Sequence, residues 1–154
     1  MKQLLFLLVM AFTISCHDSG QQTVPGLTEN PKDKDQDVSL SHTICYSTTD
    51  KDTVVLNMKV SDSSVKGTLV YKLYEKDKYL GTLQGKLFGD TLIANYQFMS
   101  EGIKSVRQVA FLIRDPIAIE GFGDVEEKNG AIIFKDPKSL NFKNGFILRK
   151  IDCE

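Results

Sequence analysis

The stretch VKGTLVYKLYEKDKYLGTLQGKLFGDTLIANYQFM, residues 65–99, decides the fold of this chain. Apolar residues or glycine occupy alternate positions from Val65 to Leu73, and lysine or threonine occupies most of the positions between them. This period of two is typical of a strand with one buried face. The charged segment EKDK and the pair Gly89-Asp90 divide the stretch into three such strands, which predicts two consecutive β-hairpins.

The same pattern continues on both sides of this stretch. Residues 53–60, TVVLNMKV, alternate before it, and the apolar runs at 106–113, IAIEGFG, AIIF and FILRKI follow it, with EEKNG as the connection before AIIF. Eight or nine short antiparallel strands joined by hairpins predict an all-β fold, a small closed up-and-down β-barrel. A β-sandwich is the alternative. The meander has few long crossovers, which favours the barrel.

Glycines at 67, 81 and 85 fall on the face that otherwise carries core residues. Such glycines mark bends of a barrel strand, or room for a ligand or a bulky neighbour. An eight-stranded barrel is only just wide enough for side chains to fill its interior, so we expect a filled core, with a ligand cavity as the alternative. The side chains expected to fill it are Tyr71, Tyr96, Phe98 and Phe111.

The N-terminal segment has the order of a secretory signal: Lys2, an apolar run to Ile14, then a small residue and a cysteine. Residues 13–16, TISC, resemble a bacterial lipobox, in which the cysteine is acylated and becomes the new N-terminus. We therefore predict a lipoprotein signal peptide at 1–15 and a palmitate-type anchor on Cys16. The polar residues up to 41 form a disordered tether, and 42–154 form the barrel domain. An ordinary signal peptide is the alternative.

Three cysteines leave one unpaired in an exported chain. If Cys16 carries lipid, Cys45 and Cys153 remain, one at each end of the domain. The oxidising environment of a cell envelope allows them to form a disulfide bond. Two reduced, buried thiols are the alternative, although burial is difficult so close to the C-terminus.

Charge and composition exclude several function classes. The chain has 19 basic and 20 acidic residues, and residues 1–15 hold one lysine and no acid, so the mature chain has a net charge of −2. We expect no nucleic-acid partner. His17 and His42 are not placed for a triad or a metal site, so no catalytic residue, metal or cofactor is predicted. A carboxylate-based hydrolase using Glu101 and Glu120 is the exception.

One charged residue lies at a position where the pattern places core residues. Arg107 shares the parity of Val109 and Phe111, so it points into the barrel near one mouth and needs a partner there. A tight hairpin at Asp115-Pro116 brings Glu120 alongside. The alternative is that the parity flips and the arginine faces water. The candidate partners for this polar binding site are Glu120, Glu101 and Asp90.

Residues 71–111, together with CYS at 45–47 and the terminal DC, resemble a group of functionally uncharacterised small lipoproteins of Bacteroidetes bacteria. The resemblance implies a lipid-anchored protein of the Gram-negative cell envelope, in the outer membrane and facing either the periplasm or the cell surface. It supplies no substrate and no partner.

These observations predict a monomeric domain that is attached to a membrane by its N-terminal lipid and acts by binding. The expected function is a protein-binding, structural or inhibitor-like module, with an envelope protein or a foreign protein as partner. The alternative is a carrier of a small apolar ligand in the barrel interior. A hollow interior favours the carrier, and a filled interior with a protruding polar loop at 100–105 favours protein binding.

Overall fold

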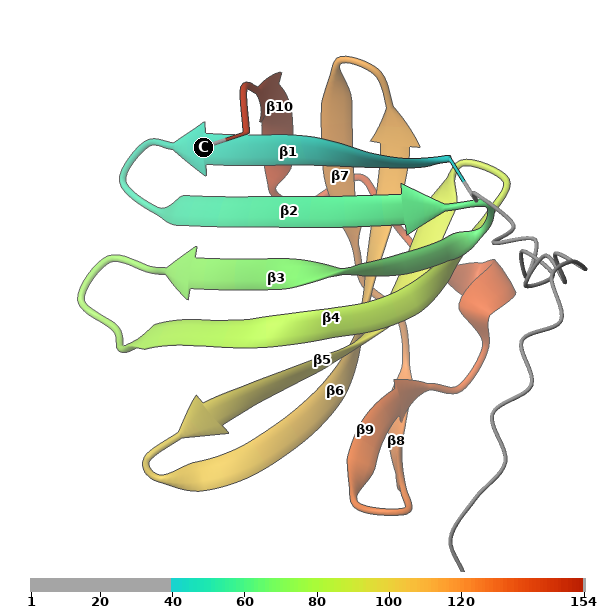
Figure 1. The fold of residues 1–154 in the computed structure, drawn as a ribbon. Coiled ribbons are helices and arrows are strands. Elements are labelled where there is room, and N and C mark those ends of the chain that lie inside the picture. The colour runs from blue at the N-terminus through green and yellow to red at the C-terminus, as the bar shows by residue number, and fades with distance from the viewer. Residues whose placement is uncertain (1–39, 154) are drawn as a thin grey trace, which may run out of the picture. The chain divides into compact units, whose positions relative to one another are not determined.

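The computed structural model describes residues 40–153, and this part of the chain is all-β (Figure 1). Cys16 and the predicted signal peptide lie outside the described residues. Within 40–153, no helix has the length and apolar character needed to cross a bilayer. The elements are β1 Ser41–Thr49, β2 Thr53–Ser61, β3 Ser64–Lys72, β4 Lys78–Phe88, β5 Thr91–Ser100, β6 Ile103–Arg114, β7 Ile117–Gly121, β8 Val125–Lys128, β9 Ala131–Phe134, the 3₁₀ turn η1 Pro137–Ser139 and β10 Ile147–Ile151.

Eight of the strands close into an antiparallel barrel, which confirms the predicted fold. Strands β1 to β7 follow one another around the barrel, and β10 fills the gap between β7 and β1. The pairing of β5 with β6 completes the ring. The result is a meander because almost every strand pairs with its neighbour in the sequence.

A disulfide bond ties the first barrel strand to the chain after the last one, as predicted. The Cys45 and Cys153 Cα atoms are 5.3 Å apart and their sulfur atoms are bonded. Cys45 also pairs with Ile151 across the β1–β10 seam. The covalent bond therefore lies beside the seam where the barrel closes.

Side chains fill the barrel interior, as the narrow width of an eight-stranded barrel predicts. Buried residues from all eight barrel strands form one continuous cluster that includes Tyr71, Tyr96 and Phe111, with Phe98 packed against it. A Cβ atom on Gly81 would lie 2.6 Å from Cε2 of Tyr96. The tyrosine ring therefore occupies the space that a side chain at this glycine would need.

The two ends of the barrel differ. The turns at 50–52, 73–77 and 101–102 lie together at one end, which we call the loop end (Figure 1). Strand β1 starts at Ser41 at the opposite end. Three hairpin turns therefore lie at the end of the barrel opposite to the start of β1.

Strands β8 and β9 form an additional hairpin beside the barrel (Figure 1). The segment EEKNG, predicted as a connection, is part of β8 and the turn that follows it. The sequence does not indicate this strand, because every side chain of β8 is exposed and its residues show no apolar alternation. The hairpin joins β6 through one parallel pair, Arg107 with Ile132. The Phe134 N–H also donates a hydrogen bond to Oε1 of Gln108 at 3.0 Å.

Candidate functional site

A polar cluster lies inside the barrel near the loop end. Arg107 is on the interior face of β6, in register with Tyr96 of β5 and two residues before the buried Val109. Glu120 is on the interior face of β7, in register with Phe111, because residues 115–116 make a two-residue turn between β6 and β7. The structure thus brings together two of the four predicted polar-site residues.

Glu120 is a carboxylate buried in a largely apolar core. Its side chain is only 4% exposed. The Tyr71 hydroxyl, which comes from β3 across the barrel, donates a hydrogen bond to Oε1 of Glu120 at 2.5 Å. The other carboxylate oxygen, Oε2, is buried without a hydrogen-bond partner in the part of the chain that the structure describes.

The guanidinium of Arg107 contacts aromatic rings. Its Cζ lies 5.3 Å from the ring centroid of Tyr71, 5.7 Å from that of Tyr96 and 5.5 Å from that of Phe98. These distances are typical of cation–π contacts. The expected ion pair with Glu120 is not formed, since no Arg107 nitrogen is within 4.0 Å of that carboxylate in the described structure. The rings hold the guanidinium, and Tyr71 holds the carboxylate.

Burial and mutual charge shift the ionisation of this cluster. Desolvation raises the pKa of the Glu120 carboxyl above its usual value, while the Tyr71 hydrogen bond and the Arg107 charge act in the opposite direction. Desolvation and the nearby Glu120 raise the pKa of Tyr71. Burial raises the pKa of Tyr96 to about 12, against a smaller lowering by Arg107. Both tyrosines therefore stay neutral at physiological pH and can donate hydrogen bonds.

The other two predicted site residues lie elsewhere. Glu101 is exposed in the β5–β6 turn with a φ of 51°, at the tip of the loop end. Asp90 is exposed in the β4–β5 turn at the opposite end, where its backbone carbonyl accepts a hydrogen bond from Ile113 N–H at 2.7 Å. Neither carboxylate is near Arg107, because turns carry them out of the barrel.

A pocket of about 220 Å³, which we call the side pocket, lies where β7 separates from β6. The last β6–β7 pair joins Ala110 to Gly121, so the wall beyond it is completed by residues 122–125 and the β8–β9 hairpin. Arg107 and Glu120 both line this pocket. Its apolar walls come from Val109, Phe122, Val125, Ile132 and Phe134.

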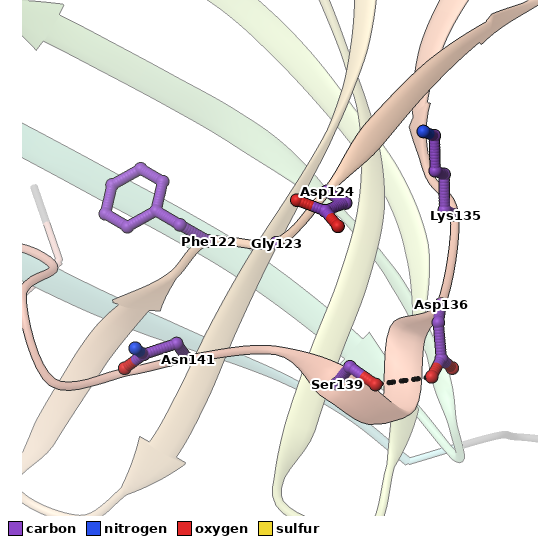
Figure 2. A pocket seen from close by; sticks show the side chains of 7 residues that line it. All are labelled: Phe122, Gly123, Asp124, Lys135, Asp136, Ser139 and Asn141. Carbon is purple, nitrogen blue, oxygen red and sulfur yellow. Dashed lines mark hydrogen bonds between the residues drawn. The ribbon is translucent and has the colours of Figure 1, made fainter.

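A second hollow, of about 440 Å³, lies on the outside between residues 122–124 and 135–141 (Figure 2). Its Asp136 accepts hydrogen bonds from the Lys138 N–H at 2.9 Å and from the Ser139 hydroxyl at 2.5 Å, which cap η1 and lower the pKa of this carboxyl. Within 40–153, no cluster of three or more metal-ligating side chains exists here or elsewhere. These polar groups hold the segment after β9 in place.

An apolar groove of about 750 Å³ runs along the outer wall. Phe88 and Ile93 of the barrel form one side, and Pro137, Leu140 and Phe142 form the other. Phe142 also packs on Gly121, where a Cβ would lie 2.3 Å from its Cε1. The side chains that line the groove thus also help to pack residues 137–142 against the barrel.

Comparison of the chain with protein-family models, with curated proteins and with solved structures finds no match. The candidate site therefore depends on geometry alone. Sequence reasoning missed the role of Tyr71 in it. Its inward parity was visible, but its contact with Glu120 crosses the barrel between strands that are not neighbours.

Proposed function

We propose that this chain is a lipid-anchored module of a Gram-negative cell envelope, related to the Bacteroidetes lipoproteins it resembles, that acts by binding another protein. The observation that carries the proposal is the packed interior, which leaves the outer surface as the place for binding another protein. The same observation weighs against a carrier that holds an apolar ligand inside the barrel. A module that binds another protein without catalysing a reaction would have a structural or inhibitor-like role.

The surface at the loop end supports this choice. Leu80 is 57% exposed and Met99 56% on the outer face of the barrel. Ile103, which is 69% exposed, lies beside the turn at the barrel mouth with the inward parity of Ser105 and Arg107, and we call Leu80, Met99 and Ile103 the loop-end patch. Leu80 and Met99 line a shallow depression of about 360 Å³ together with Lys104. Apolar side chains gathered on a surface mark interaction sites, and the lysine at the rim favours a partner with acidic residues around an apolar centre.

Site-specific photo-crosslinking in intact envelopes tests this proposal. A photoreactive amino acid in place of Leu80 or Met99 should give one discrete crosslinked product. The matched positions are Lys59 and Lys66, an exposed cross-strand pair on the outer face of β2 and β3. These should give no such product, because they lie away from the loop-end patch.

A charge placed in the patch provides the second arm of the experiment. Ile103→Glu should reduce the crosslink from Met99 at least about fivefold, because burying an unpaired carboxylate in an apolar interface is costly. The residue is exposed beside a turn, so the fold tolerates the change. Equal products from Lys59 and Met99, or no effect of Ile103→Glu, would contradict binding through this patch.

The proposed anchor leads to a separate prediction. Metabolic labelling with a palmitate analogue should label the wild-type chain and not Cys16→Ser, because the thiol at the lipobox-like junction is the acylated group. Two or three acyl chains give stable anchoring where one does not. Cys45→Ser is the control and should keep its label. Equal background labelling of the wild type and Cys16→Ser would rule out the lipoprotein assignment.

A further inference from the structure

We propose that the side pocket binds a compact molecule whose head group combines an oxygen acceptor with an N–H donor on a small branched apolar body. An apolar α-amino acid and a short aliphatic amide both have this chemistry. The site is distinct from the loop-end patch, so this inference stands independently of the protein-binding proposal.

Arg107 supplies the donors that such a head group needs. Its guanidinium makes neither a hydrogen bond nor an ion pair with the residues that the structure describes, and its Nε is buried. The three aromatic rings fix its position without using its N–H groups. A guanidinium held in this way is preorganised to donate to a ligand oxygen.

Glu120 supplies the acceptor. One of its oxygens, Oε1, is taken by Tyr71, and Oε2 is buried without a partner although the side chain is only 4% exposed. Buried polar atoms in folded proteins normally have a partner, so each exception requires an explanation. Because Oε2 has almost no accessible surface, the wall of the side pocket must open slightly for a ligand N–H donor to reach it and satisfy this atom.

The charges and walls of the side pocket set the rest of the ligand. Arg107 is positive, and Glu120 is negative when its carboxyl is ionised. Each simple ion is then attracted by one of these groups and repelled by the other, whereas a zwitterion or a neutral amide can complement both. Val109, Ile132 and Phe134 provide apolar walls. The volume of about 220 Å³ limits the body to a few carbon atoms.

Calorimetric titration of the full, disulfide-bonded chain in detergent tests the assignment. The probes are L-leucine and 3-methylbutanamide, which carry both halves of the head group. The comparators are 4-methylpentanoate, which lacks the N–H donor, and 3-methylbutylamine, which lacks the acceptor. At least one probe should bind about tenfold or more tightly than both comparators, since each charge-assisted hydrogen bond contributes that much. Tighter binding of L-leucine would identify the ligand as an apolar α-amino acid, and tighter binding of 3-methylbutanamide would identify it as a short aliphatic amide.

Variants locate the binding. Arg107→Gln and Glu120→Gln should each weaken binding about tenfold or more, whereas Arg114→Gln and Glu101→Gln, at exposed positions, should not. Ile132→Ser changes an exposed wall residue without touching the core, and should weaken binding about threefold even if the polar variants unfold. Comparators that bind as well as the probes, no binding at millimolar concentration, or full binding by Ile132→Ser would overturn the proposal.

Discussion

Replacing both Cys45 and Cys153 with serine is expected to lower the free energy of unfolding by about 4–5 kcal/mol on the chain-entropy model. The bond spans a sequence separation of 108 residues, so its loss frees a long loop in the unfolded chain. It also lies beside the β1–β10 seam, which has only three residue pairs in register. Urea unfolding followed by circular dichroism measures the loss.

Two controls separate the bond from the side chains. Wild-type protein that is reduced and then alkylated should lose about as much stability as the double serine variant. Lys150→Ala removes the exposed ion pair between β10 and Asp115 in the β6–β7 turn and should cost under about 1 kcal/mol. A double serine variant within about 1 kcal/mol of wild type would show that strand pairing alone closes the barrel.

Most of the fold follows from the sequence because its strands have one buried face. From Val65 to Met99, alternation sets both the strands and the side that each residue faces, and the Gly89-Asp90 pair sets the register of one hairpin. The odd number of cysteines predicts the disulfide, because assigning Cys16 to the lipid leaves Cys45 and Cys153 to pair. Strand β8 escapes this reasoning because it has no buried face and forms only by pairing with β9.

Part of the candidate site was predictable from the same alternation along the strands. Parity places Arg107 inside, and the tight turn places Glu120 on the neighbouring strand. Contacts across the interior depend on strand tilt and stagger, which parity does not specify. The Tyr71 hydroxyl therefore reaches Glu120 from the far wall, and the guanidinium lies among three rings where a direct ion pair was expected.

Arg107→Gln is expected to lower the free energy of unfolding by about 2–3 kcal/mol at pH 8, because it leaves the buried Glu120 carboxylate without its nearby positive charge. The variant also loses cation–π contacts worth up to about 1 kcal/mol at any pH. Arg114→Gln, exposed on the same strand, should cost no more than about 0.5 kcal/mol. Urea unfolding at several pH values measures each loss.

The pH dependence identifies Glu120 as the cause. Its folded pKa is raised above the ordinary value of 4.5, so its contribution to stability is fully present below that value and is lost as pH rises through the folded pKa. Arg107 lowers this folded pKa, so Arg107→Gln raises it further and increases the loss at higher pH. At pH 4 the carboxyl is protonated in both proteins, and the difference between them should shrink to the cation–π part. Adding Glu120→Gln to Arg107→Gln should remove the pH dependence of that difference. A loss of the same size at pH 4 and pH 8 would mean that Arg107 acts only by packing on the rings, and that its charge does not reach Glu120.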